Sequence, residues 1–229
     1  MRLAIIQART NSSRLPNKMF HLLGGRPIID WVISRVKKSK NIDKLALATS
    51  TNKKDDRLFD FALKNKIFVY RGDEENVLQR FKECADLFEP HSIVRVCADN
   101  PLIDSREIDK LINQFDHNKF DYAFNHLDKL NSKYADGFGA EIISYKTLKY
   151  IYGKAKSNYH REHLTSYIWD NLEKFKILTL NASKDLAYPN LRFDVDTQED
   201  LDNLNSLISL GLDINSTAQE IINISTSLK

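Results

Sequence analysis

The sequence predicts an α/β fold, in which a mostly parallel sheet is covered by helices on both sides. The main observation is that a short apolar strand, a polar loop and an amphipathic helix follow one another four times in the first half of the chain. The composition agrees, because 42% of the 229 residues are hydrophobic, enough to cover both faces of a sheet. This length fits one such domain, or one domain with an excursion, so we expect a single domain over residues 1–229.

We expect four strands and four helices in the first half of the chain. The first strand, Leu3 to Ile6, is a short run of β-favouring apolar residues. Pro27 suits the first turn of a helix, and Asp104 can cap the start of another. The expected strands are residues 3–6, 44–49, 67–70 and 92–97, and the expected helices are residues 27–39, 54–65, 74–88 and 105–115.

The regular alternation stops in the second half. Thr197 begins a helix there, because its TxxD pattern is close to a capping box, and the tail from Gly211 reads as a weak terminal helix. The other expected elements are strands at residues 121–125, about 138–143, 175–181 and 191–195, and helices near residues 144–155 and 160–171.

Charge, cysteine content and hydropathy argue against several classes of protein, namely nucleic-acid-binding, disulfide-rich and membrane proteins. The formal net charge is only +3, from 34 basic and 31 acidic residues, and no dense basic run is present, so we expect no nucleic-acid partner. The two cysteines, Cys84 and Cys97, form no disulfide framework, and we interpret them as core residues in a reducing compartment. The N-terminus lacks a signal-peptide pattern, and no segment approaches 18 apolar residues. We therefore expect a cytoplasmic protein without a membrane partner.

The loop that follows the first strand is the strongest candidate for a binding site. It holds Arg9, Arg14 and Lys18 among small polar residues such as Ser13. Guanidinium groups and inward-turned backbone N–H groups at the end of a first strand are typical of polyphosphate binding. The loop is neither GxxxxGK[ST] nor GxGxxG, so it differs from a P-loop and from a dinucleotide fingerprint. The alternative is a solvated basic loop.

Three aspartates are candidate metal ligands. Asp99 directly follows the fourth strand, and Asp194 and Asp196 lie in the late FDVDT sequence. Ligands of parallel α/β sheets lie beyond the carboxyl ends of the strands, and Mg²⁺ favours one or two carboxylates together with phosphate oxygens. The alternative is that Asp99 is a turn residue, and that Asp194 and Asp196 are surface acids, Asp196 capping the next helix.

Two further segments carry candidate residues for a second substrate. In HREH, Arg161 and His163 can bind an acidic or hydroxylated molecule, although a plain helix surface explains them equally well. His160 and His163 share a helix face, but no third ligand is near in sequence, so a zinc site is not expected. The YADGFGAE sequence offers Asp136 and Glu141, with glycines that allow close backbone approach.

The loop sequence QARTNSSRLPNK resembles the QAR-x-x-S-x-RLP-x-K loop of the cytidylyltransferase family, most closely the spore coat polysaccharide biosynthesis protein F type. The wider family includes the CMP-KDO and CMP-sialate synthetases. The resemblance extends from Leu3 to about Leu204. It also covers RGDEENVLQRF, VRVCADNPLID, YADGFGAEI, REHLTSYI and VDTQEDL, each in the expected order.

The resemblance implies a glycosyltransferase-A-like three-layer α/β/α sandwich with a Rossmann-like sheet, forming one nucleotidyltransferase domain. An excursion at about residues 125–170 would serve acceptor binding and homodimer formation. The implied reaction transfers CMP from CTP to a sugar or sugar-phosphate acceptor and releases pyrophosphate, with Mg²⁺ as cofactor, for surface polysaccharide or glycan synthesis. The sequence departs from the family pattern at Asn17, at Cys97 and Ala98, and in the FGAE run, and it does not identify the acceptor.

The resemblance and the residue patterns described above together assign roles to individual residues. Lys18, Arg14 and Asp99 are the expected catalytic residues. The expected acceptor-binding residues are Asp136, Glu141, Arg161 and His163. The expected metal ligands are Asp99, Asp196 and Asp194, and the expected nucleotide-binding residues are Ala8, Arg9, Ser13, Arg14, Lys18, Gly72 and Gln79.

Two other functions are consistent with these residues. A glycosyltransferase that consumes a nucleotide sugar could use the DVD sequence at 194–196, although the cationic loop after the first strand argues against it. A non-catalytic nucleotide sensor would bind CTP and release nothing. Pyrophosphate release separates both from a cytidylyltransferase.

Overall fold

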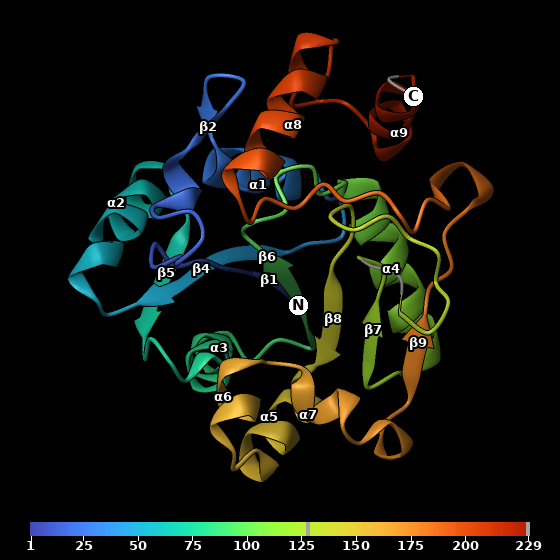
Figure 1. The fold of residues 1–229 in the computed structure, drawn as a ribbon. Helices are drawn as coiled ribbons and strands as arrows, with labels where there is room; N and C mark the ends of the chain where they lie inside the picture. The colour runs from blue at the N-terminus through green and yellow to red at the C-terminus, as the bar shows by residue number, and fades with distance from the viewer. Residues whose placement is uncertain (127–128, 228–229) are drawn as a thin grey trace.

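The computed structural model describes residues 1–126 and 129–227. In these residues the chain forms a seven-stranded sheet in the order β5-β4-β1-β6-β8-β7-β9, and β8 is the strand that runs antiparallel to its neighbours (Figure 1). A small hairpin of two further strands lies outside this sheet. The strands are β1 (Arg2–Gln7), β2 (Leu22–Leu23), β3 (Arg26–Pro27), β4 (Lys44–Ser50), β5 (Phe68–Gly72), β6 (Ser92–Cys97), β7 (Tyr122–Phe124), β8 (Glu141–Ser144) and β9 (Ile177–Thr179).

The first three predicted helices of the first half are present with shorter bounds, the fourth extends further to Asn118, and the helix predicted at 160–171 is fragmented. The α-helices are α1 (Ile28–Val36), α2 (Asp56–Lys64), α3 (Val77–Asp86), α4 (Ser105–Asn118), α5 (Tyr145–Lys154), α6 (Asn158–Glu162), α7 (Ser166–Trp169), α8 (Gln198–Ser209) and α9 (Ala218–Thr226). Short 3₁₀ helices are η1 (Lys18–Phe20), η2 (Lys53–Asp55), η3 (Leu172–Lys174) and η4 (Lys184–Leu186). No helix in the described ranges is long and apolar enough to cross a membrane.

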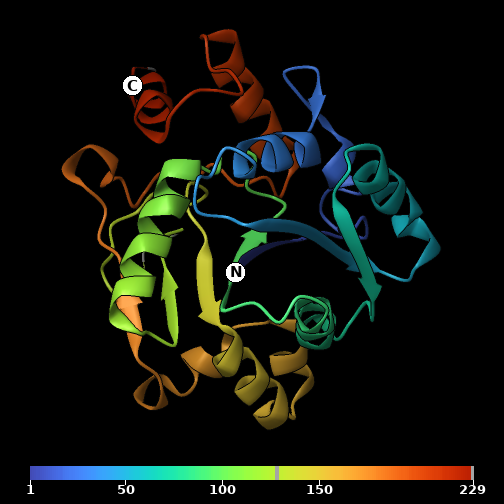
Figure 2. The same ribbon diagram turned by 180° about the vertical axis from the view of Figure 1, so that it is seen from behind.

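Each face of the sheet has its own hydrophobic core. Successive strand residues point to opposite faces, so Leu3 and Ile5 of β1 join one core and Ala4 and Ile6 join the other. Helices α1, α4, α8 and α9 cover the face of Ala4 and Ile6, and α3, α5, α6 and α7 cover the opposite face (Figures 1 and 2). The predicted α/β fold, a mostly parallel Rossmann-like sheet between two helical layers, is therefore confirmed.

The predicted strand at 191–195 is wrong. This segment makes one isolated bridge, between Asp136 and Arg192, and otherwise runs as an irregular connection. Its backbone bonds to two loops instead of a ladder: Phe193 N–H donates to the Asp136 carbonyl at 3.0 Å, and Val195 N–H donates to the Asp99 carbonyl at 2.8 Å. Apolar alternation in LRFDV thus reflects burial of Phe193 and Val195 against the core, not membership of the sheet.

The predicted helix at 160–171 is also wrong as a continuous element. It is divided into α6 and α7, because side chains divert the backbone between them. His163 takes an extended conformation, with φ −105° and ψ 94°, and its carbonyl accepts a hydrogen bond from Ser166 Oγ at 2.7 Å. Thr165 Oγ1 donates to buried Glu141 at 3.1 Å. Tertiary contacts therefore override the helical pattern of this segment.

The glycine-rich run before β8 makes the close approach expected of it. A Cβ at Gly139 would overlap the Asn125 carbonyl oxygen, and Gly137 has φ +107°. The Asn125 side chain fixes this contact, because its Oδ1 accepts from Ala140 N–H at 3.0 Å. The run thereby places Glu141 at the start of β8, beside β6.

Candidate active site

The loop after β1 has a fixed shape. Buried Asp55 accepts hydrogen bonds from the Thr10 N–H at 2.7 Å and from the Thr10 hydroxyl at 2.6 Å. The same carboxylate accepts from the Ser50 hydroxyl at 2.5 Å. Leu15 is buried at the middle of the loop, and Asn17 turns the chain in the left-handed region, with φ 58°. These contacts anchor residues 8–18 at the carboxyl end of β1 and at the carboxyl end of its neighbour β4.

Lys18 joins this loop to two carboxylates. Its side chain is only 9% exposed, and its ammonium lies 3.3 Å from Asp99 Oδ2 and 3.0 Å from Asp196 Oδ1. Arg14 contacts the other oxygen of Asp196, with 2.7 Å between Nη2 and Oδ2. Two predicted phosphate-binding cations and two predicted metal ligands therefore meet at one place, although they are up to 182 positions apart in the sequence.

The two carboxylates reach this place from different elements. Asp99 follows β6, and Asp196 precedes α8, while the Val195 N–H bond to the Asp99 carbonyl ties the two segments together. Thr197 is the N-cap of α8 and forms a capping box with Asp200. Asp196 is thus not needed as the helix cap, and its side chain is available to the cations.

A cleft of about 610 Å³ opens at this junction, at the carboxyl ends of β1 and β6. It is lined mainly by polar and charged side chains from the loop, the sheet and the segments around Asp99, His163 and Asp196. The lining residues are Gln7, Ala8, Arg9, Asn11, Ser12, Ser13, Arg14, Lys18, Met19, Arg95, Cys97, Ala98, Asp99, His163 and Asp196. The cleft therefore collects Ala8, Arg9 and Ser13 of the predicted nucleotide-binding residues, together with the catalytic candidates.

Asp99 and Asp196 fit a magnesium ion by the chemistry of their donor atoms. One atom of Lys18 contacts an oxygen of each carboxylate, so a single cation can lie near both. Mg²⁺ needs only one or two carboxylates when phosphate oxygens and waters complete its shell. In the described part of the chain no group of three or more His, Cys, Asp or Glu side chains could hold a metal, so a zinc-type cage is not present there.

Two other predicted acids lie outside the cleft lining. Asp194 binds Arg192 through both oxygens, at 2.7 and 3.1 Å, and not the cations of Asp196. Asp136 is half-buried beside it, and burial together with the negative charge of Asp194 raises the pKa of Asp136 to about 6. Since 194–196 is not a strand, the two aspartates of the DVD sequence take separate partners.

Of the residues predicted to contact the nucleoside, Ala8 lines the cleft, whereas Gly72 and Gln79 do not. Gly72 ends β5, two strands away from β1, and a Cβ there would lie 3.0 Å from Arg80 Cγ and Tyr70 Cε1. Gln79 on α3 donates to Glu83 at 2.9 Å and accepts from Asn76 at 3.0 Å. Neither Gly72 nor Gln79 lines the cleft, so their contact with a nucleoside stays a prediction.

The predicted acceptor-binding residues are only partly brought together. His163 lines the cleft, whereas Arg161 is exposed on α6, and His160 pairs with Asp170 at 2.8 Å. Glu141 is 4% exposed and forms an ion pair with Arg95, which itself lines the cleft.

Sequence reasoning missed Arg95. The available signal was a charged residue in the middle of the apolar strand SIVRVC. A cation within a strand that is buried on both faces requires a partner or a function.

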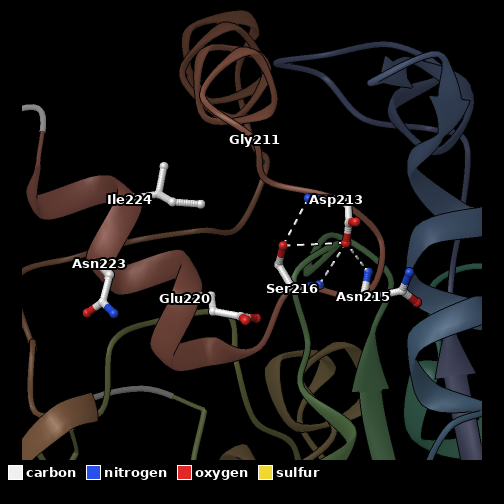
Figure 3. A pocket seen from close by; sticks show the side chains of 7 residues that line it. All are labelled: Gly211, Asp213, Asn215, Ser216, Glu220, Asn223 and Ile224. Atoms are coloured by element: carbon white, nitrogen blue, oxygen red, sulfur yellow. Dashed lines mark hydrogen bonds between the residues drawn. The ribbon is translucent and has the colours of Figure 1, made fainter.

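A second pocket, of about 440 Å³, lies between the end of α8 and the start of α9 (Figure 3). Its polar groups bind one another. The Asp213 carboxylate accepts from the N–H groups of Asn215 at 2.6 Å and Ser216 at 3.0 Å, and the Ser216 hydroxyl accepts from Asp213 N–H at 2.9 Å. This arrangement is a side-chain-stabilised turn that starts α9, and we assign it no ligand.

Comparison with known proteins identifies the family to which the chain is similar. The family model described as Cytidylyltransferase matches residues 3–223. Among solved structures, a cytidylyltransferase from Leptospira borgpetersenii serovar Hardjo-bovis is similar with a TM-score of 0.92 and 29% sequence identity, covering 99% of this chain and 94% of that one.

Two curated relatives are similar in sequence. The spore coat polysaccharide biosynthesis protein SpsF of Bacillus subtilis is 32% identical over 210 residues, which cover 90% of this chain and 85% of the relative. The 3-deoxy-manno-octulosonate cytidylyltransferase of Fusobacterium nucleatum is 33% identical over 118 residues, which cover 51% of this chain and 47% of the relative.

Proposed function

The chain belongs to the cytidylyltransferase family, and we propose that it activates a sugar by transferring CMP from CTP with release of pyrophosphate. The observation that carries this proposal is the junction at Lys18, where cations of the loop after β1 meet Asp99 and Asp196 in one cleft. A triphosphate needs several cations for its oxygens, and a divalent ion on it needs nearby carboxylates.

The loop supplies the triphosphate contacts. Arg9, Arg14 and Lys18 line the cleft, and the Asp55 contacts hold their loop in place before the ligand arrives. A guanidinium offers paired N–H donors to phosphate oxygens, and a lysine offers a compact point charge. Lys18 and Arg14 now neutralise Asp99 and Asp196, so they are in position to exchange part of these contacts for phosphate oxygens.

Asp99 and Asp196 would hold Mg²⁺. The ion, when bound, supplies Lewis-acid stabilisation of charge on the phosphate oxygens. The protein's contribution is to place both carboxylates beside the cations of the loop. Asp194, which is paired with Arg192, would support the segment instead of binding the ion directly.

The reaction is an in-line displacement at the α-phosphorus of CTP. An acceptor oxygen forms the new P–O bond, and a hydroxyl acceptor gives its proton to water. The bond to the β-phosphate oxygen breaks, and pyrophosphate leaves with the electron pair. Negative charge grows on the leaving group, and Lys18 and Arg14 are the cations placed to stabilise it. Catalysis of this kind rests on positioning and charge stabilisation in the transition state.

The acceptor and the setting are proposed from the relatives. Their names point to an acidic sugar, 3-deoxy-manno-octulosonate, and to synthesis of a surface polysaccharide. His163 in the cleft, with Arg161 near it in the chain, would contact this acceptor. We further propose that the enzyme works in the cytoplasm, where CTP is available, and that it forms a homodimer through residues of the 125–170 region.

A screen of acceptors with CTP and Mg²⁺, read by pyrophosphate release, tests the proposed function. We expect release that requires both an acceptor and Mg²⁺, and that CTP supports better than ATP, GTP or UTP. CTP binding without release under any acceptor would indicate a nucleotide sensor. Release of a nucleoside diphosphate from a nucleotide sugar would instead indicate a glycosyltransferase.

A further inference from the structure

Two buried polar atoms at the cleft have no hydrogen-bond partner among the described residues. They are Arg95 Nε, a donor, and Gln7 Oε1, an acceptor. Both residues line the cleft, and both belong to adjacent strands, where Gln7 pairs in register with Cys97, two positions after Arg95. A buried donor or acceptor left unsatisfied is costly, so such a pair at a cleft needs an explanation.

Arg95 is held in place by a buried carboxylate. It lies opposite Glu141 in the antiparallel pairing of β6 with β8, and its Nη1 donates to Glu141 Oε2. Glu141 also accepts hydrogen bonds from Tyr122 and Thr165. Burial alone would raise the pKa of Glu141, but Arg95, His126 and the Tyr122 hydroxyl outweigh it and lower the pKa to about 2. Glu141 is therefore ionised at neutral pH and fully occupied by protein groups.

The guanidinium of Arg95 has capacity beyond this ion pair. It carries five N–H donors, and Glu141 takes one edge through Nη1. Its side chain keeps 18% exposure and lines the cleft. Neighbouring His126 adds no charge at neutral pH, because burial lowers its pKa to about 4. Arg95 is thus a cation that is held through Nη1 and whose partly exposed side chain forms part of the cleft wall.

Arg95 is separate from the proposed triphosphate contacts. Those contacts come from residues 8–18, whose cations pair with Asp99 and Asp196. Arg95 instead belongs to β6, two positions before Cys97. It is linked instead to the segment of His163, because Glu141 binds both Arg95 and Thr165. One buried carboxylate therefore binds two groups that lie outside the proposed triphosphate contacts.

We propose that Arg95 is a specificity-determining residue that binds an anionic group, carboxylate or phosphate, of the sugar acceptor, and that Glu141 is its positioning residue. This inference rests on the proposed function. A guanidinium recognises planar carboxylates and phosphate oxygens through paired N–H groups. The part of the Arg95 side chain that is exposed in the cleft would make this contact.

The first test measures binding by calorimetry on enzyme saturated with CMP and Mg²⁺. Three probes separate the sources of charge: 3-deoxy-manno-octulosonate for a carboxylate, glucose 1-phosphate for a phosphate, and glucose as the neutral case. We expect one anionic probe to bind at least about tenfold more tightly than glucose, which identifies the source. We expect Arg95→Gln to remove this preference while leaving the Kd for CTP within about twofold. Arg95→Lys should recover part of the preference, because it keeps the charge and loses the paired geometry.

Arg2→Gln is the matched control, since Arg2 also pairs with a carboxylate, Asp116 at 2.8 Å, but at the start of β1 and outside the cleft lining. It should leave all probe affinities unchanged. Equal binding of the three probes to the wild type, or an unchanged preference in Arg95→Gln, would overturn the inference.

Kinetics test the positioning role of Glu141. Glu141→Gln leaves a buried guanidinium without its counter-charge and can fail to fold, so Thr165→Val serves as the milder variant. Both should raise the acceptor KM severalfold with little change in the CTP KM, whereas a purely structural role would lower Tm without this split. An active enzyme whose acceptor KM is unchanged in Arg95→Gln and Thr165→Val rejects this inference alone. A wild type that releases no pyrophosphate with any acceptor rejects the proposed function instead.

Discussion

Lys18 determines the charge balance of the cleft, because its ammonium contacts both Asp99 and Asp196. We predict that Lys18→Ala raises the KM for CTP and lowers kcat, with a total loss in kcat/KM of about 2–3 kcal/mol, the range of a charge-assisted contact. Steady-state kinetics at varied CTP concentration measure this loss. Lys44→Ala, an exposed lysine at the start of β4, is the control and should behave as wild type. Unchanged CTP kinetics in Lys18→Ala would remove the loop from the site.

Asp99 and Asp196 form the second residue-level prediction. Asp99→Asn and Asp196→Asn should each abolish most pyrophosphate release, because each removes a charge that a hard cation needs and keeps the shape. The double variant should be little worse than either single variant, since residues that act as a unit are not additive. Near-normal rates in either single variant at saturating Mg²⁺ would contradict a shared metal.

Asp194→Asn provides the matched comparison within the same sequence. Its carboxylate binds Arg192 at 2.7 Å and lies outside the cleft lining, so the variant should lose much less activity than Asp196→Asn. Metal titrations should show an unchanged Mg²⁺ requirement. A loss as large as that of Asp196→Asn would place Asp194 among the metal ligands.

At the scale of elements, the loop after β1 depends on buried Asp55. Burial raises the pKa of Asp55, but hydrogen bonds from Ser50 and Thr10 outweigh it, so the pKa lies below its usual value. A carboxylate with a lowered folded pKa stabilises the fold above its unfolded pKa of about 3.9 and loses this contribution as the pH falls through the folded pKa.

We therefore predict that Asp55→Asn lowers the free energy of unfolding at pH 7 by about 1–3 kcal/mol. The difference from wild type should shrink as the pH falls from about 3.9 through the lower folded pKa, because the unfolded chain and then the folded Asp55 take up a proton. Urea unfolding at several pH values measures both effects. Asp60→Asn, at an exposed position on α2, is the control. A deficit that stays constant down to the lowest pH would show that the charge of Asp55 is irrelevant.

How far the sequence determines the elements depends on what supports each of them. Strand β1 and the capping box at Thr197 are local patterns, and both are present as predicted. The segment 191–195 and the helix at 160–171 were mispredicted because their backbones are governed by partners far away in sequence, such as Asp99 and Glu141. Local periodicity contains no information about such partners.

The same distinction between local sequence patterns and distant partners applies to the residues of the site. The cationic loop and the aspartates at segment ends were predictable from residue type and position, and Lys18, Asp99 and Asp196 do meet. The separation of Asp194 from Asp196 was not predictable, because it depends on the pairing with Arg192. Arg95 was missed because its place beside the cleft follows from the antiparallel pairing of β6 with β8.

At the scale of the whole molecule, the helical layer of α5 and α6 exposes several aromatic side chains. Tyr150, Tyr152 and Tyr159 are 44%, 37% and 57% exposed. If the proposed homodimer forms there, sedimentation velocity should give a mass of twice 26.5 kDa, and Tyr159→Glu should shift the protein toward the monomer. A monomer at all concentrations would refute the dimer without affecting the proposed reaction.

The central claim is that the cleft at Lys18 transfers CMP, and ³¹P NMR of a single reaction mixture tests it most directly. With CTP, Mg²⁺ and an acceptor found by the screen, we predict that pyrophosphate and a new CMP adduct appear in equal amounts and at equal rates. The adduct is a phosphodiester for a hydroxyl acceptor and a diphosphate diester for a sugar phosphate. Neither signal should appear with excess chelator or in Asp99→Asn. Consumption of CTP to CDP or free CMP, or CTP binding with no new phosphorus signal, would contradict the claim.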